Sequence, residues 1–565
     1  QSADDSISKN NDSLNYWGSQ FTKFGLAGSG SVNIIQMANE TNNNISDWVE
    51  PKSSAKYKIK SSAKDSVKVQ NWSGAIAFGK NGASQPKKGG VSERNESAGQ
   101  FTLAGAATVN QISRNVKNNI ENINFDENQF SYDATASTEG AETTAAAISL
   151  SVGVNKATNL SIAGSLAFNF TNPPDSFGDT VSSTANAITA SNLESISLNA
   201  INGAKLVAGA GTAGIAANPF RLSGKDTDAA APSKALTFGF SVAVNDIKTA
   251  TNTEISNSKL NYGNYSTPTV ISLNSNTAGS QLTAVSIAAG GSYSGGTSQG
   301  GLGSLAVAGS GAGAQNTLQN PTTALIQASK INPQQGINTR DIKLKTEADE
   351  QLLSITGGLD VAIAGGASSG DTSSISVGAS ASYNEINGDI KSHIDSETNI
   401  NARNLAIETT DNGQIGAYAI AGGASGSTSG AGRLSNTFSG SIVGAGTGNK
   451  INRKLWAVVG NPDQDASVGS GILRVTKATI KAERGERSRI IADAAGAALS
   501  FSSTDRRAIS VGIAGGFSFN QLTGGVKAGI YNISDYGSSE ATDISAIAKR
   551  GDTFLLADGN ISSFA

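Results

Sequence analysis

Residues 375–384 read Ile-Ser-Val-Gly-Ala-Ser-Ala-Ser-Tyr-Asn and alternate strictly between two kinds of side chain. From Ile375 to Tyr383 the larger apolar side chains and alanine occupy one parity. Ser and Gly occupy the other parity, which closes on Asn384. A period of two over this length is typical of a β-strand, whose successive side chains point to opposite faces. The stretch therefore predicts a strand.

The same element recurs along the chain, for example at residues 101–110 and 236–245. Its copies close on an asparagine about every 70 residues, and in most copies an Ile, Leu or Phe follows two positions later. The repeat asparagines are Asn33, Asn110, Asn169, Asn245, Asn316, Asn384, Asn436 and Asn520. Such a period predicts an all-β fold, a parallel β-helix or β-solenoid of degenerate repeats with loop insertions.

Two further elements lie in each repeat. Residues 400–409 align without gaps to residues 337–346, and Ala/Gly-rich strands such as 415–423 follow. Three strand-bearing elements per repeat predict three coils of some twenty residues each. Parallel stacking at about 4.8 Å per coil would then give a rod on the order of 120 Å long.

The domain organisation follows from the same pattern. We expect a polar N-terminal segment at residues 1–20 and one continuous solenoid over residues 21–565. Clusters of Gly, Pro and charge predict insertion loops near 79–99, 217–233, 290–303 and 460–471.

The alternation also bears on which face is buried. We expect the larger parity, including Phe238, Val242, Val377 and Tyr383, to point inward. The other parity is too small for an ordinary solvated face, so it predicts close approach of another backbone layer, with asparagines stacked into amide ladders. The alternative is a flat exposed face that merely avoids charge.

Composition excludes several classes of function. The chain has 66 glycines, no cysteine and a single histidine, His393, which removes disulfides, thiol chemistry and zinc sites rich in Cys or His. A net charge of −3 gives no electrostatic footprint for nucleic acid. No run of eighteen apolar residues is present, so we expect no transmembrane helix. The chain begins without methionine, and we expect a processed product or a piece of a longer precursor.

Motif matches are weak. Residues 209–214 fit the Gly-x-Gly-x-x-Gly dinucleotide fingerprint but lack a following helix, and residues 74–80 resemble a phosphate loop in which Asn81 replaces the required Ser or Thr. We expect no cofactor and no catalytic residue. The acidic clusters, one of them at 347–350, are expected to be solvated turns, and the basic residues between 477 and 507 an outer face. Calcium is a weak possibility at Asp226, Asp228, Asp463 and Asp465.

A resemblance adds to this interpretation. Ile400-Asn-Ala-Arg-Asn-Leu-Ala-Ile407, interleaved with strands such as Ala419-Ile-Ala-Gly-Gly423, resembles the repeats of giant bacterial filamentous adhesins of the haemagglutinin-like and leukotoxin-like kinds. The resemblance implies a right-handed, rod-like β-helix on the surface of a Gram-negative bacterium or secreted by one. It carries over no functional residue.

The sequence therefore predicts a non-enzymatic, structural or adhesive extracellular protein. We expect partners to be other copies, a continuation of the same chain, or cell-surface glycans or matrix. Residues 554–564 remain strand-like, so we expect that edge to be continued into a fibre. Two rivals stay open: a surface-layer lattice protein and a polysaccharide-cleaving enzyme of the parallel β-helix type.

Overall fold

The computed structural model describes most of the chain as strands. The described residues are 16–20, 25–47, 55–80, 99–154, 158–171, 179–218, 233–263, 269–277, 279–296, 303–332, 340–366, 370–429, 435–462, 471–485, 488–533, 535–536, 543–550 and 554–564. Within them the fold is all-β, and no helix is present.

The strands in chain order are β1 (Tyr16–Gln20), β2 (Gly25–Ser46), β3 (Lys56–Lys64), β4 (Lys68–Lys80), β5 (Gln100–Ser137), β6 (Glu142–Val154), β7 (Thr158–Thr171), β8 (Asp179–Ile201), β9 (Lys205–Asn218), β10 (Lys234–Ser256), β11 (Lys259–Tyr262), β12 (Thr269–Asn276), β13 (Gln281–Gly296), β14 (Ser304–Gln319), β15 (Thr322–Gln327), β16 (Lys330–Ile331), β17 (Asp341–Ala348), β18 (Gln351–Gly366), β19 (Thr372–Asn387), β20 (Ile390–Ile394), β21 (Asn399–Asp411), β22 (Gln414–Ser429), β23 (Asn436–Asn452), β24 (Leu455–Val459), β25 (Ile472–Arg484), β26 (Arg489–Ser503), β27 (Arg507–Thr523), β28 (Val526–Ile530), β29 (Asp535–Tyr536), β30 (Asp543–Arg550) and β31 (Phe554–Phe564).

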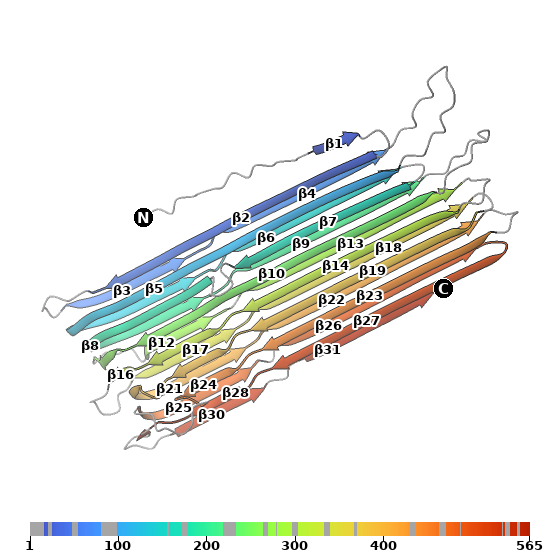
Figure 1. The fold of residues 1–565 in the computed structure, drawn as a ribbon. Coiled ribbons are helices and arrows are strands. Elements are labelled where there is room, and N and C mark those ends of the chain that lie inside the picture. The colour runs from blue at the N-terminus through green and yellow to red at the C-terminus, as the bar shows by residue number, and fades with distance from the viewer. Residues whose placement is uncertain are drawn as a thin grey trace.

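Two sheets hold these strands, and neighbouring repeats pair in parallel. Sheet A has 23 strands, and sheet B has eight in the order β31-β26-β22-β18-β13-β9-β6-β4, one from each repeat. Only β1 runs antiparallel, against the start of β2. The chain thus passes once through sheet A and once through sheet B per repeat, a path consistent with a β-solenoid (Figure 1). We number the coils 1 to 8, at residues 25–80, 100–154, 158–218, 234–296, 304–366, 372–429, 436–503 and 507–564.

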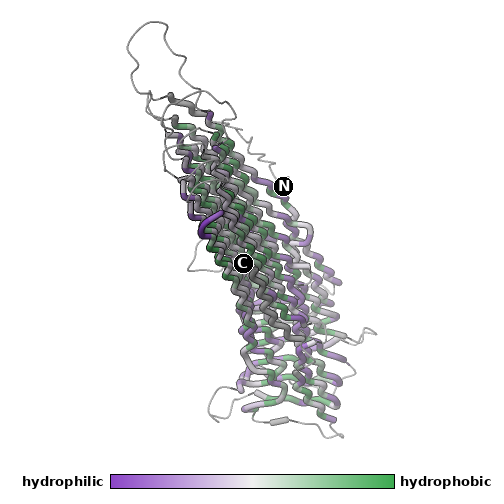
Figure 2. Tube along the Cα trace, turned by 90° about the vertical axis from the view of Figure 1, so that its right-hand side faces the viewer, coloured by the Kyte–Doolittle hydropathy of each residue, from purple (hydrophilic) through white to green (hydrophobic). Residues whose placement is uncertain are grey.

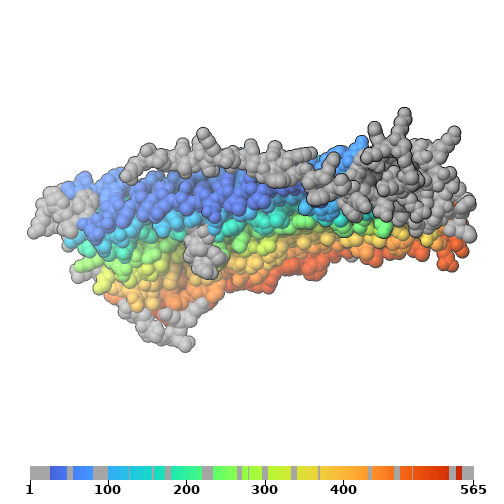
Figure 3. Space-filling view, turned by 45° about the horizontal axis from the view of Figure 1, so that its top comes forward, coloured from blue at the N-terminus to red at the C-terminus, as the bar shows by residue number. Residues whose placement is uncertain are grey.

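The prediction of three coils per repeat is wrong, because one repeat makes one wide coil. Strand β10 alone has 23 residues, about 75 Å of extended chain. Eight coils at about 4.8 Å stack to only roughly 35 Å. Each coil therefore runs the length of the molecule, as the lengthwise colour bands of Figure 3 show. The reason lies in the pattern: the inward parity continues through Asn245 to Ile255 without a break, so no corner forms after the asparagine.

The inward face is the opposite of the one expected. In β10 the small side chains from Ala235 to Asn245 are buried, whereas Phe238 and Phe240 stay 40% and 49% exposed. Val377 in β19 is likewise exposed, and Tyr383 is partly so. The small-residue parity instead packs sheet A against sheet B, which confirms the expected close approach of a second backbone layer. We call this thin two-layer part the blade.

Glycine makes that approach possible. A Cβ built on Gly239 would lie 2.7 Å from the backbone oxygen of Ala289 in the facing sheet, and one on Gly358 would lie 2.8 Å from that of Ala379. Ordinary face-to-face sheets need about 10 Å to hold their side chains. In the blade the interior is filled by alanine methyls, hydroxyls and backbone, so bulky residues fit only on the outside.

The other part of each coil has an ordinary core. Past the asparagine position the interior fills mainly with Ile, Leu, Phe and Tyr from sheet A strands, and most charged side chains lie on the outside. Phe125 and Phe130 stack there with ring centroids 4.1 Å apart. We call this part the wide end. Figure 2 shows the change of character along the strands, with hydrophilic residues gathering over the wide end.

Two of the expected segments contain strands. Strand β1 lies within the segment 1–20 that was expected to stand apart, and residues 290–296 belong to β13 and not to a loop. Most of the four predicted insertions, at 81–98, 219–232, 297–302 and 463–470, lies outside the described residues.

Candidate functional site

A ladder of asparagine side chains runs through the stack where the blade meets the wide end. In every member but the last, the Nδ2 donates to the Oδ1 of the next coil, at 2.7 to 3.0 Å, and also to a backbone oxygen of sheet B. Its members are Asn110, Asn169, Asn245, Asn316, Asn384, Asn449 and Asn520. The ladder ties every pair of neighbouring coils from 2 to 8 and both sheets together.

Two of the eight predicted repeat asparagines are not in this ladder. Asn436 begins β23, and its place is taken by Asn449, thirteen residues later. Asn33 pairs in register with Thr108, so the position equivalent to Asn110 in coil 1 is Ile35. There Asn71 of β4 donates to Asn110 at 2.9 Å instead. The error at Asn436 comes from a second Asn near the true position, whereas in coil 1 the true position holds Ile35 and no asparagine.

An aliphatic column lies two residues beyond the ladder. Ile112, Ile247, Leu318 and Ile386 were identified from the sequence, and they pack in one buried cluster with Leu or Ile side chains from the starts of the sheet B strands. The column closes the blade against the wide end. The column serves packing and not chemistry, because none of its side chains has acid, base or nucleophilic character.

A buried ion network joins coils 5, 6 and 7. Arg453 donates to both carboxylate oxygens of Glu350 at 2.8 Å and lies 3.6 Å from Asp411, which also faces Arg484 at 3.3 Å. All four side chains are almost fully buried. Burial opposes the charge of Arg453, but the two carboxylates raise its pKa above the ordinary value. Arg484 was expected on an outer basic face, and that expectation is wrong.

One carboxyl group stands alone in the blade interior. Asp360 of β18 is buried, and its Oδ2 accepts a hydrogen bond from Ser310 at 2.7 Å. A Cβ built on Gly290 would lie 2.6 Å from Asp360 Oδ1, so glycine backbone surrounds the group. Burial raises the pKa of Asp360 to about 7, although the bond from Ser310 lowers it. No sequence motif singled this residue out.

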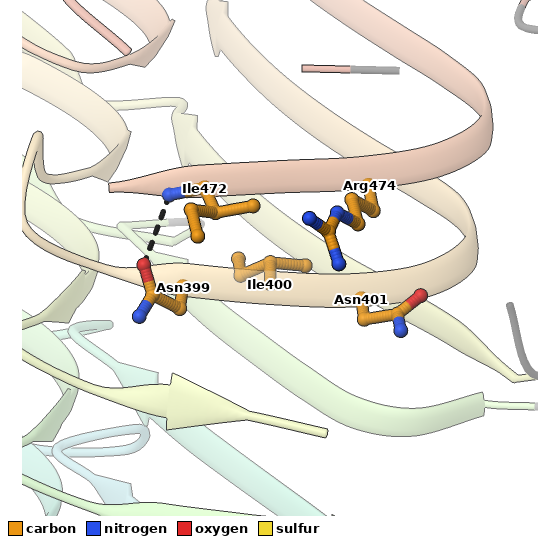
Figure 4. A pocket seen from close by; sticks show the side chains of 5 residues that line it. All are labelled: Asn399, Ile400, Asn401, Ile472 and Arg474. Atoms are coloured by element: carbon orange, nitrogen blue, oxygen red, sulfur yellow. Dashed lines mark hydrogen bonds between the residues drawn. The ribbon is translucent and has the colours of Figure 1, made fainter. Parts of the chain in front are cut away.

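A hollow of about 40 Å³ lies at the wide end among Asn399, Ile400, Asn401, Ile472 and Arg474 (Figure 4). The two strands that line the hollow are joined by a hydrogen bond from the Ile472 N–H to Asn399 Oδ1 at 2.9 Å. The hollow is large enough to hold water.

The other predicted motifs lie on strands. Residues 209–214 are part of β9 and residues 74–79 part of β4, so neither glycine cluster forms a loop that could hold a phosphate. His393 lies on β20, partly buried, with Nε2 2.9 Å from the Gly460 oxygen, and burial lowers its pKa. No group of three metal-ligating side chains occurs among the described residues.

The acidic clusters differ from one another. Glu347 bonds to Lys345 at 2.7 Å on the surface, whereas Glu350 belongs to the buried network. The solvated-turn interpretation is thus wrong for Glu350. The calcium candidates Asp226, Asp228, Asp463 and Asp465 lie outside the described residues.

The outer faces of the blade carry its main exposed apolar surface. Both carry large apolar side chains, and several rings cover glycines of a neighbouring coil. The Phe240 ring occupies the space over Gly164, and the Phe519 ring that over Gly448. On the middle strands of sheet B, Leu359 and Ile420 each remain 61% exposed.

Comparisons with protein-family models, with curated proteins and with solved structures find no match to this chain. In the part that the structure describes, no helix is long and apolar enough to cross a membrane. The candidate function therefore rests on the chain's own geometry.

Proposed function

We propose that this chain is a β-solenoid of degenerate repeats of about 70 residues, serving as a structural or adhesive segment of an extracellular surface fibre. The observation that carries the proposal is the unbroken parallel register from β2 to β27, with a matched residue in every coil. A continuous stack of equivalent coils makes an extended scaffold, and its polar interior groups serve coil-to-coil contacts.

Support for a non-enzymatic role comes from what the polar residues do. The asparagines bond to one another, and Glu350 and Asp411 form ion pairs with arginines. A polysaccharide-cleaving enzyme needs two carboxylates facing one open groove. Among the described residues, the acidic side chains at 347–350 are divided between the surface and the core.

Head-to-tail growth is part of the proposed function. The last coil's strands β27, β28, β30 and β31 each pair with a described strand on one side only. Unpaired strand edges recruit another chain unless they are covered. We propose that another copy, or more of the same protein, continues this edge, and that the exposed surfaces contact glycans or matrix at a bacterial cell surface.

Negative-stain microscopy and fibre diffraction of the purified chain test the proposal. We expect filaments with a reflection near 4.8 Å along the filament axis, because the coils stack along it. Two-dimensional sheets would support a surface-layer lattice instead. Release of reducing ends from a polysaccharide, abolished by one Asp or Glu substitution, would support the enzyme.

A further inference from the structure

The outer face of sheet B is an apolar surface with a polar row along one edge. The outward side chains of its strands form rows across the sheet, which we follow through β4, β6, β9, β13, β18, β22 and β26. Between the row that starts at Lys68 and the row that includes Phe78, the only charged outward side chain is Asp493. We call this surface the B face. It goes beyond the fibre function proposed above, because it lies along the side of the stack and not at its ends.

The exposure of the B face is not an effect of the end coils. Ile287, Leu359 and Ile420 lie on β13, β18 and β22, the middle strands of the sheet, and expose 53%, 61% and 61% of their surface. Side chains on middle strands already have neighbours on both sides. Large apolar groups that remain this open indicate a surface that is completed by a partner.

The size of the B face suits a stable protein interface. Seven strands at about 4.8 Å and ten residues at about 3.3 Å give roughly 30 Å by 33 Å, or about 950 Å². A standard interface buries about 800 Å² on each partner. One edge of the face is a polar row with mixed charge, in which Lys68 bonds to Glu142 at 3.1 Å and Gln281 to Gln351 at 3.5 Å. An apolar centre with a polar rim is the usual anatomy of a protein interface.

The B face also has relief. Nothing lies within 4 Å of a Cβ built on Gly209 or Gly211, so β9 is open at these two positions, which we call the furrow. The furrow runs between the ridges of Ile148 on β6 and Ile287 on β13. A ridge on the strand beside a furrow can enter the furrow of an identical face turned by a two-fold axis, which closes the contact.

From this geometry we propose that two copies of this chain associate side by side, B face against B face. The relief favours a partner of fixed shape over fluid lipid. The polar row holds Lys68, Lys205 and Arg489 beside Glu142, and neutral glutamines separate Lys205 from Arg489. Its basic residues are therefore spread along the edge, whereas surfaces that bind membranes gather Lys and Arg. The pair would join two stacks laterally and thicken a fibre without changing its length.

Sedimentation velocity on the full-length chain and two double variants tests the proposal. Leu359→Lys with Ile420→Lys places two charges at the centre of the B face, and we expect the dissociation constant of the pair to rise at least 100-fold. Gln315→Lys with Gln521→Lys adds the same charge to exposed positions on sheet A, and we expect it to leave the pair intact. Far-UV circular dichroism and the melting temperature check that each variant is folded.

A further variant tests shape alone. Gly211→Trp fills the furrow without removing apolar area, and the open space there lets the chain fold. We expect it to weaken the pair about as much as the lysine variant. A wild-type chain that does not pair at 100 μM, or pairing unchanged in both B face variants, would overturn the proposal. Binding of wild type to phosphatidylcholine–phosphatidylglycerol vesicles, lost in the lysine variant and kept in Gly211→Trp, would assign the face to lipid instead.

Discussion

We expect each member of the asparagine ladder to contribute strongly to the free energy of unfolding, and substitution of Asn316 tests this expectation. Asn316 is fully buried, accepts from Asn245 Nδ2 at 2.7 Å, and donates to the Leu353 oxygen and to Asn384 Oδ1 at 2.8 Å each. Replacing it with alanine removes three hydrogen bonds at about 1 kcal/mol net each. It also leaves the Leu353 carbonyl and the Asn384 oxygen with fewer partners in a site that water does not reach.

The expected loss in the free energy of unfolding for Asn316→Ala is therefore about 3 to 5 kcal/mol. Urea denaturation of the full chain, followed by far-UV circular dichroism and tryptophan fluorescence, measures it. The matched control is Gln315→Ala, its neighbour on the exposed face of β14, which should cost less than about 0.5 kcal/mol. A loss below about 1 kcal/mol for Asn316→Ala, or equal losses in the two variants, would refute the role given to the ladder.

Three further substitutions address the interior. Burial raises the pKa of Asp360 to about 7, above its value near 4 in the unfolded chain, so between these pH values the folded chain holds an extra proton. The free energy of unfolding should therefore fall by up to about 4 kcal/mol as pH rises from about 4 to 7. Asp360→Asn should remove much of that fall in melting curves taken across this range. Glu350→Gln should cost about 3 to 5 kcal/mol in urea, because it leaves Arg453 buried with a weaker partner, and an unchanged midpoint would contradict the account of the network. Gly239→Val should lower the melting temperature markedly, because its Cβ would lie 2.7 Å from the Ala289 oxygen, whereas a neutral result would mean that the layers are farther apart.

Strand type and repeat period could be predicted from the sequence, because both depend on local alternation. The residues 375–384 alternate in the structure as they do in the sequence, and six of the eight predicted asparagines stand in the ladder. One of the two errors has a local cause as well. Near Asn436 the chain offers another asparagine, Asn449, and only the pairing of β23 with its neighbours selects between them.

Which face of each blade strand points into the interior could not be predicted in the same way. Each parity of the blade strands is uncharged, so either could be buried, and the choice depends on how closely the facing sheet approaches. That distance is set by residues such as Ala289, fifty positions from Gly239 in the sequence. The buried network was hidden for a similar reason, since Arg453 and Glu350 are 103 residues apart.

Single cysteines give the most direct test of the central claim, that the small-residue parity is inside and the large-residue parity outside. The chain has no cysteine of its own, so Ser376→Cys and Val377→Cys each introduce one thiol at neighbouring positions of β19. Ser376 is 0% exposed and Val377 is 42% exposed. The account predicts that maleimide labels the native Val377→Cys chain quickly and the native Ser376→Cys chain slower by roughly 100-fold or more, while both react alike in urea. Fast labelling at position 376 with protection at position 377 would contradict it.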